Sequence, residues 1–204
     1  MTVNYEIDHV KNIYDIIAPE FDITRTYNWP WVNNIMDSFP ENSLIYDIGC
    51  GNGRNMRYKK HQFIGVDNCD KFVEMCINNN MNAIYSDMTN IQLPSNSADI
   101  AMSIASFHHL SNNENRIKAL LEMKRIIKDD GQIIISVWSI NQPKKTRVTF
   151  ENYGDNMVYW KNKHARYYYI FKLDEIRTLV HTAGLIIIDS YYDCGNEIFI
   201  LKKS

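Results

Sequence analysis

Mostly apolar runs of four to seven residues recur along this chain, separated by polar stretches rich in charged residues and asparagine. The runs cover residues 44–48, 63–66, 82–85, 99–104, 132–138, 185–188 and 198–201. Short runs of this kind are typical of strands that are buried on both faces of a sheet. The pattern therefore predicts seven strands.

The first forty residues carry the apolar spacing of two amphipathic helices. The stripe of the first helix is made of Val10, Ile13, Tyr14 and Ile17. We expect Pro19 to end this helix, because proline lacks the N–H group that a helix interior uses. Pro30 suits the first turn of a second, shorter helix, which we expect to end near residues 39–40.

Three later segments have the same helical spacing. They are residues 69–77, a stripe after Ser111, and a stripe around residues 176–183 that ends at Gly184. Ser111 and Glu114 have the spacing of a capping box, which predicts the start of the middle helix. We expect that helix to end at residues 130–131. Its predicted buried face consists of Ile117, Leu120, Leu121, Met123 and Ile127.

Strands and helices alternate, which predicts βαβ units and a mostly parallel sheet. The turn at residues 193–196 leaves no room for a crossover helix, so the final strand should run antiparallel near an edge. We expect an α/β fold, with a seven-stranded, mostly parallel Rossmann-like sheet flanked by helices and the two N-terminal helices as a lid. No regular structure is predicted for the polar residues 139–165.

Length and composition narrow the class of protein. The 204 residues suffice for one domain, and the formal charge of −2 gives no global basic field of the kind that marks many nucleic-acid binders. No apolar run approaches the roughly 20 residues of a membrane helix. Four cysteines without CxxC spacing predict reduced thiols in the cytoplasm and no metal site.

Candidate chemistry lies where the first three predicted strands end. Residues 47–53 read Asp-Ile-Gly-Cys-Gly-Asn-Gly, so the backbone can pass close to a ligand and offer amide groups to an anion. Asp67 follows the second strand, where a carboxylate can hold ribose hydroxyls. Asp87 follows the third strand and could accept from an adenine amino group. Each feature alone is also typical of a tight turn or a helix cap.

Together these features fit a nucleoside that carries a carboxylate. Nicotinamide dinucleotides prefer G-x-G-x-x-G, and here Arg54 occupies the place of the third glycine. Residues 40–140 resemble the class I S-adenosylmethionine-dependent methyltransferases. The resemblance implies S-adenosyl-L-methionine as the cofactor. The expected cofactor-binding residues are Asp47, Gly49, Cys50, Gly51, Asn52, Gly53, Asp67, Asn68, Asp87, Met88, Ser103 and Ile104.

Segments outside this core carry a closer resemblance. They are His9-Val10, Tyr14-Asp15, Ile17-Ala18, Thr24-Arg25, Trp29-Pro30, Ser103-Ile104-Ala105, His108-His109, Val137-Trp138, Arg166-Tyr167-Tyr168, Phe171, Tyr191-Tyr192-Asp193 and Gly195-Asn196. With residues 47–52, they resemble the eukaryotic tRNA wobble-uridine methyltransferases, which methylate the carboxylate of 5-carboxymethyluridine. Tyr169 and Glu197 depart from the family pattern, which usually has histidine and tryptophan there. These departures lie on the expected substrate side.

The resemblance implies a single methyltransferase domain over residues 1–204. Its expected parts are a helical lid (1–40), a cofactor-binding core (41–138), a substrate-side insertion (139–171), and a C-terminal helix and strand pair (172–204). A carboxylate acceptor is ionised at neutral pH and needs no general base. It needs positioning, for which the fork of an arginine is suited. The expected positioning residues are Arg25, His108, Arg116, Arg166 and Asn196.

Partners follow from the same resemblance. It implies the tRNA anticodon loop as substrate and a small zinc-binding activator protein, for which an exposed edge strand is the natural docking surface. Basic residues interleaved with aromatic ones around residues 144–166 suit a single-stranded RNA loop. Two alternatives stay open: a small-molecule methyltransferase on the same core, and a non-catalytic module that binds the cofactor. A nicotinamide oxidoreductase is a more distant alternative.

Overall fold

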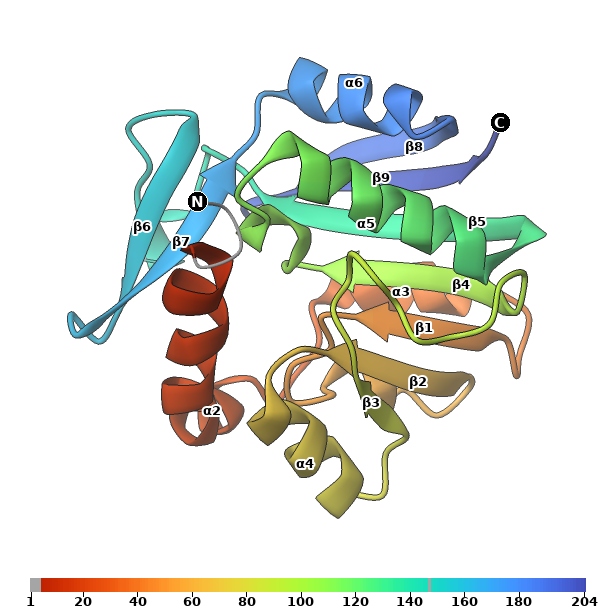
Figure 1. Cartoon of the computed structure of the whole chain (residues 1–204), viewed down its shortest axis with the longest axis horizontal. Helices are drawn as coiled ribbons and strands as arrows, with labels where there is room; N and C mark the ends of the chain where they lie inside the picture. The colour runs from red at the N-terminus through yellow and green to blue at the C-terminus, as the bar shows by residue number, and fades with distance from the viewer. Residues whose placement is uncertain (1–4, 147) are drawn as a thin grey trace.

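A central sheet of seven strands organises the computed structural model, which describes residues 5–146 and 148–204 (Figure 1). The strands are β1 (Leu44–Ile48), β2 (Gln62–Asp67), β3 (Ala83–Tyr85), β4 (Ala98–Ile104), β5 (Ile127–Trp138), β8 (Leu185–Asp193) and β9 (Asn196–Lys203). Their spatial order is β3-β2-β1-β4-β5-β9-β8. In this described sheet β9 runs antiparallel to both of its neighbours, β5 and β8, whereas the pairs among β1 to β5 are parallel. The predicted sheet is confirmed, including its reversed last strand beside an edge.

Helices cover both faces of the sheet. They are α2 (Asn12–Thr24), α3 (Pro30–Asp37), α4 (Asp70–Asn78), α5 (Asn113–Ile126) and α6 (Leu173–Thr182), with short turns η1 (Ile7–Lys11), η2 (Asn55–Arg57), η3 (Phe107–His109) and η4 (Lys144–Thr146). Alternate β5 residues serve the two faces: Ile133 and Ile135 pack with α5 and α6, whereas Ile134 packs with α3. This alternation is the period of a strand, so one buried run supports two hydrophobic layers.

Helix α2 contradicts the expected end at Pro19, because it continues through the proline to Thr24. The next turn brings Phe21 against Tyr14 and Phe72, with ring centroids 5.6 Å and 5.4 Å away. This packing offsets the backbone hydrogen bond that proline cannot make. The helix therefore reaches further than the sequence pattern indicated. Within the described part of the chain, no helix has the length and apolar character to span a membrane.

Residues 139–165 contain regular structure that the sequence analysis did not predict. Strands β6 (Gly154–Trp160) and β7 (His164–Ile170) pair as an antiparallel hairpin outside the main sheet. The hairpin lies beyond one end of the sheet, beside α2 (Figure 1). Lys161 and Asn162 both have positive φ, as a type I′ turn requires. The turn lacks the glycine that usually marks such a hairpin, which is why the pattern escaped prediction.

Helix α5 begins and ends differently from its prediction. Its N-cap is Asn112, whose side chain accepts a hydrogen bond from the Asn115 amide at 2.9 Å. Ser111 instead donates its amide and its hydroxyl to the Glu6 carboxylate, at 2.6 and 2.7 Å. Ile126 is the last residue of the helix, well before residues 130–131. Leu121 is 46% exposed and so does not belong to the buried face.

Candidate functional site

One cavity of about 590 Å³ opens at the carboxyl ends of β1, β2 and β4. Helix α2, the β6–β7 hairpin and the β8–β9 turn contribute the rest of its wall. Ligands of doubly wound sheets bind at this end of the strands. The volume falls within the range of small-molecule sites.

The loop after β1 is held close to the sheet by glycine geometry. Gly49 has a φ of +76°, and a Cβ there would lie 2.2 Å from the Ser106 Oγ atom. The Ser106 hydroxyl donates to the Ile48 carbonyl at 2.9 Å and so fixes the loop. Gly51 is more open, because a Cβ there would meet only the Phe21 ring, at 3.8 Å. The loop therefore leaves room for close approach of a ligand to the Gly51 backbone.

Asp67 ends β2 with its carboxylate against this loop. Its Oδ2 accepts from the Gly51 amide at 2.8 Å, and its Oδ1 accepts from the Cys69 amide at 2.9 Å. Burial nevertheless raises the pKa of Asp67 to about 6. A carboxylate has about four lone-pair positions, so two acceptor positions stay open for further donors. Two ribose hydroxyls are donors of the required kind.

The strand after Asp67 supplies a second acidic corner. Asp87 accepts from the Thr89 amide and hydroxyl at 2.8 and 2.7 Å, and from the Asn68 side chain at 3.1 Å. Asn68, Asp87 and Met88 all line the cavity. Asp87 thus caps its own turn and also orients Asn68.

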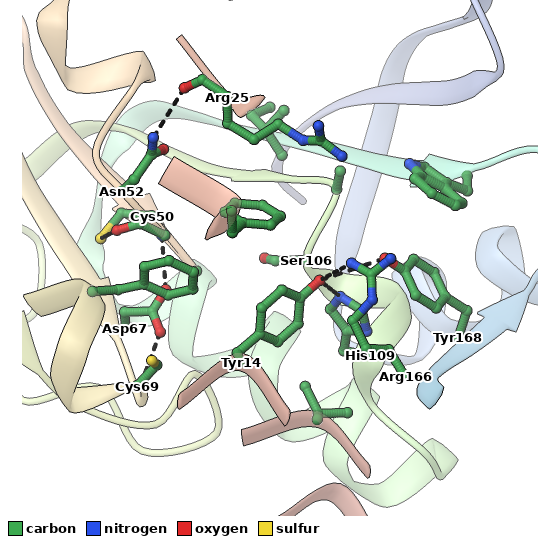
Figure 2. A pocket seen from close by; sticks show the side chains of 18 of the residues that line it. Tyr14, Arg25, Cys50, Asn52, Asp67, Cys69, Ser106, His109, Arg166 and Tyr168 are labelled. Carbon is green, nitrogen blue, oxygen red and sulfur yellow. Dashed lines mark hydrogen bonds between the residues drawn. The ribbon is translucent and has the colours of Figure 1, made fainter. Parts of the chain in front are cut away.

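Eight of the twelve residues expected to bind the cofactor line the cavity. They are Gly49, Cys50, Gly51, Asp67, Asn68, Asp87, Met88 and Ile104. Asn52 also lines it, but its side chain donates to Asp22 at 2.8 Å and to the Arg25 carbonyl at 2.9 Å. These bonds tie the end of α2 to the glycine loop, as Figure 2 shows for the Arg25 carbonyl.

Asp47, Gly53 and Ser103 do not line the cavity, and their expected contact with the cofactor stays a prediction. Asp47 is fully buried, its Oδ2 accepts from Asn55 at 3.2 Å, and burial raises its pKa to about 7. A Cβ at Gly53 would lie 2.9 Å from the Cys76 Sγ atom, so this glycine lets the loop close on α4. The Ser103 hydroxyl lies 2.8 Å from that of Ser106. All three residues stabilise the glycine loop after β1 through contacts within the protein.

The opposite side of the cavity carries positive charge. Arg166, on β7, is 4% exposed, and its guanidinium lies 5.3 Å from each of the Trp160 and Tyr168 ring centroids. The guanidinium of Arg25, after α2, lies 5.9 Å from the same Trp160 ring, and among the described residues its side chain donates only to Thr24. Neither arginine forms an ion pair with any residue that the structure describes. This end of the cavity therefore favours an anion.

The hydroxyl of one tyrosine forms hydrogen bonds that connect three elements of the cavity wall. The Tyr14 hydroxyl of α2 lies 3.0 Å from His109 Nε2 and 3.4 Å from the Tyr168 hydroxyl. Arg166 Nη1 donates to the same hydroxyl at 3.1 Å. Figure 2 shows these side chains meeting on the side of the cavity away from Asp67. Tyr14 and His109 belong to segments that carry the family resemblance, and the sequence left open whether Tyr14 stacks on the base, covers the cofactor or lies in the core.

Asn196 lines the cavity, as expected. It is 2% exposed, and its Oδ1 has no partner among the described residues. The β5–β9 register places it opposite Trp138, whose ring stacks on Tyr168 with centroids 4.7 Å apart. An unsatisfied buried acceptor beside a stacked aromatic pair suits a planar ligand with an N–H edge.

His108 and Arg116 do not line the cavity, and their expected role in positioning the substrate stays a prediction. His108 Nδ1 accepts from the Trp138 amide at 3.1 Å, and burial lowers its pKa well below the usual range. Arg116 donates to the Leu110 carbonyl at 2.9 Å and to Asn113 at 2.7 Å. Both side chains therefore support the turn that carries His109.

Two further residues of the cavity lining have types that are common in cores and on surfaces, so the sequence left their role open. Trp29 and Arg54 form a pair in which the guanidinium lies 3.9 Å from the ring centroid, and burial lowers the Arg54 pKa to about 10. From the sequence, Arg54 breaks a dinucleotide motif and belongs to a local cluster of basic residues at 54–61. Its place directly after the glycine loop is the signal that could have found it.

Comparisons with known proteins agree with this geometry. A family model described as a methyltransferase domain matches residues 46–135. The chain is 34% identical to the tRNA (carboxymethyluridine(34)-5-O)-methyltransferase of Schizosaccharomyces pombe, over all of both chains. It is 35% identical to the Arabidopsis thaliana protein of the same name, over 72% of this chain and 37% of that one.

Solved structures share the fold. One is a chain from the complex between the Haloferax volcanii Trm112 methyltransferase activator and a methyltransferase, with a TM-score of 0.70, 15% identity, and coverage of 95% of this chain and 96% of that one. Another is a Methanosarcina mazei SAM-dependent methyltransferase, with a TM-score of 0.70, 15% identity, and coverage of 87% and 98%.

The glycine loop yields a stability prediction. Gly49→Ala should lower the free energy of unfolding by about 3 kcal/mol or more, because it adds a clash with Ser106 to an unfavourable φ. Gly154→Ala is the matched control, with a φ of +88° and no atom within 4 Å of a Cβ. It should cost only about 1 kcal/mol. Urea unfolding measures both, and equal losses would contradict the close contact at Gly49.

Asp47 yields a pH prediction. The folded protein raises its pKa from 3.8 to about 7, so the folded state holds the proton more tightly than the unfolded state. Asp47 therefore destabilises the fold increasingly as pH rises between these values. Asp47→Asn removes this effect, so from pH 5 to pH 8 the variant should gain about 2 kcal/mol relative to the wild type. Urea unfolding at both pH values tests this, and a constant difference would contradict it.

Proposed function

The chain belongs to the family of the tRNA (carboxymethyluridine(34)-5-O)-methyltransferases, and we propose that it methylates the carboxylate of 5-carboxymethyluridine at the tRNA wobble position, forming the methyl ester. The observation that carries the proposal is the pair Arg25 and Arg166, two cations on the cavity wall without an acidic partner among the described residues. A ligand carboxylate is the natural partner of such a pair.

The acidic side of the cavity fits the cofactor S-adenosyl-L-methionine. Asp67 has acceptor positions left for two ribose hydroxyls, which would stabilise a carboxylate whose pKa burial raises to about 6. The open space at Gly51 suits the methionine part, and Asn68 with Met88 suits the adenine. When bound, the cofactor supplies an electrophilic methyl group on a sulfonium sulfur.

The arginine side would bind and orient the acceptor. A carboxylate is ionised at neutral pH, so no residue needs to remove a proton. Arg166 would hold the carboxylate through its fork, and Arg25 would neutralise the remaining charge. The surrounding rings of Tyr14, Trp160 and Tyr168 keep water from the carboxylate, which favours the loss of charge during transfer.

The uracil ring would lie next to this clamp. Trp138 and Tyr168 offer stacked aromatic faces, and the free Asn196 Oδ1 could accept from the uracil N3–H group. This places Asn196 in nucleoside recognition. His108 and Arg116 would act indirectly, through the turn that holds His109.

Transfer RNA would contact a basic-aromatic rim made of Lys144, Lys145, Tyr159, Lys161 and Lys163. All five are exposed, and Lys161 alone among the four lysines pairs with a described carboxylate, Glu20 at 2.8 Å. Tyr159 is 61% exposed and also lines the cavity. Free lysines and an exposed ring at a cavity mouth suit the phosphates and unstacked bases of an anticodon loop. The four cysteines are free thiols, which suits a protein that acts on tRNA in the reducing cytoplasm.

A small zinc-binding activator protein would dock on the edge strand β3. Its outer edge is unpaired in the described sheet. Tyr85, the last residue of β3, is 53% exposed, and Ile77 of the neighbouring α4 is 56% exposed. The other edge strand, β8, has a bulge between Ile187 and Asp189, a device that discourages strand addition. Strand addition at β3 is therefore the favoured mode.

The direct test is incubation of the protein with labelled S-adenosylmethionine and total tRNA, with and without an activator of the Trm112 kind. Label should appear in a uridine methyl ester when nucleosides are identified by mass. Replacing Lys144, Lys145, Lys161 and Lys163 by glutamine should slow transfer to tRNA at least tenfold at 0.15 M salt and reduce the salt dependence.

Two controls sharpen this test. The same four-lysine variant should methylate free 5-carboxymethyluridine at the wild-type rate. A matched variant that loses Lys71, Lys118, Lys128 and Lys202, none of which lines the cavity, should leave transfer to tRNA unchanged. Label confined to small molecules would contradict the tRNA proposal.

The two sides of the cavity should separate in mutagenesis. Asp67→Asn should abolish binding of S-adenosylhomocysteine, because the amide offers a donor where ribose hydroxyls need an acceptor. Arg166→Gln should keep that binding within about threefold and slow transfer by about a hundredfold. Calorimetry and single-turnover kinetics measure the two effects. Equal loss of cofactor binding in both variants would contradict this division.

A further inference from the structure

We infer that Tyr14 is a positioning residue whose hydroxyl, oriented by His109, aims the free N–H edge of Arg166 at the substrate and makes the site selective for a carboxylate over a carboxamide. The inference rests on the proposed function, since it assigns a role within the proposed acceptor site. It stands on the hydrogen bonds that join α2, η3 and β7 inside the cavity.

The direction of the hydrogen bonds starts at His109. Its Nδ1 atom lies 2.7 Å from the Tyr167 carbonyl oxygen. A carbonyl only accepts, so Nδ1 carries a proton. Burial lowers the pKa of His109 to about 3, so the ring is neutral at physiological pH. Its Nε2 atom therefore has a lone pair and accepts.

Tyr14 must then donate to His109, because the two atoms lie 3.0 Å apart and Nε2 has no proton. The single hydroxyl proton is used in this bond, so the Tyr14 oxygen faces Arg166 with a lone pair. Arg166 Nη1 donates to that lone pair at 3.1 Å. The tautomer of His109 thus determines which way the Tyr14 hydroxyl points.

This bond fixes one guanidinium nitrogen of Arg166, the Nη1 atom. Its Nε atom is buried and has no partner among the described residues. A guanidinium carries five N–H donors and no acceptor, so every free position on it offers a hydrogen. A carboxylate presents only acceptors and satisfies this edge. A carboxamide presents an NH₂ group at one of the two positions and leaves donors facing each other.

Selectivity of this origin has a definite size. A site built to satisfy a buried polar group rejects an analogue that leaves it unpaired by roughly 10- to 100-fold. The natural comparison is 5-carboxymethyluridine against 5-carbamoylmethyluridine, which differ only in this group. The wild-type protein should prefer the carboxylate by about 30-fold or more.

Tyr14→Phe isolates the hydroxyl. The ring of Tyr14 packs against Phe21 and Phe72, with centroids 5.6 Å and 5.9 Å away, and phenylalanine keeps these contacts. The variant should therefore fold and bind S-adenosylhomocysteine within about twofold of the wild type. Without its fixed partner, Arg166 can turn, and the preference for carboxylate should fall to about threefold.

The matched control is Tyr5→Phe. Tyr5 lies on the same N-terminal segment and packs on Tyr167, 5.3 Å away, but does not line the cavity. It should keep the full preference. The readout is the ratio of dissociation constants for the two free nucleosides, measured by calorimetry on the protein saturated with S-adenosylhomocysteine.

The outcomes separate the two proposals. A wild-type preference that survives in Tyr14→Phe, with tRNA methylation intact in the wild type, overturns the role of Tyr14 alone. A wild-type protein that neither methylates tRNA nor prefers the carboxylate overturns the proposed function and this inference together. A preference lost in Tyr14→Phe and kept in Tyr5→Phe supports the inference.

Discussion

A buried arginine without an acidic partner is the constraint on which the rest of this site depends. Arg166 is 4% exposed, and its charge is met only by aromatic faces and the Tyr14 hydroxyl among the described residues. Burying a charge in this way costs free energy that the protein recovers only when an anion arrives. The hairpin and α2 are arranged around this charge. The site therefore has a built-in demand for a carboxylate or a similar anion.

The opposite wall of the cavity, on the β2 side, holds a buried carboxylate. Asp67 accepts from two backbone amides, and burial raises its pKa to about 6, so further donors from a ligand would stabilise its charged form. One cavity thus presents a surplus of acceptors on the β2 side and a surplus of donors on the β7 side. A neutral sugar with hydroxyls and an anionic acceptor satisfy the two sides separately. This polarity explains how a chain with a formal charge of −2 can bind an anion at one point.

The sequence predicted the sheet because the signal for a strand is local. A short apolar run such as 132–138 indicates a buried strand whatever the rest of the chain does. The cofactor wall was also predictable, because glycines and acids at three successive strand ends together indicate a ligand site, although each alone is typical of a turn or a helix cap. The arginine side of the cavity, where the methyl acceptor would bind, was harder to predict. Tyr14, His109 and Trp160 come from three elements far apart in the chain, and each looks like a core residue alone. The hairpin that carries Arg166 was missed because Lys161 and Asn162 adopt positive φ without a glycine to announce it.

A crystal structure of the protein with S-adenosylhomocysteine and 5-carboxymethyluridine tests the central claim most directly. The account predicts that the ribose hydroxyls of the cofactor product contact Asp67 and that the uridine carboxylate contacts Arg166 in the same cavity. A carboxylate seated on exposed lysines instead, with Arg166 still unpaired, would contradict the account.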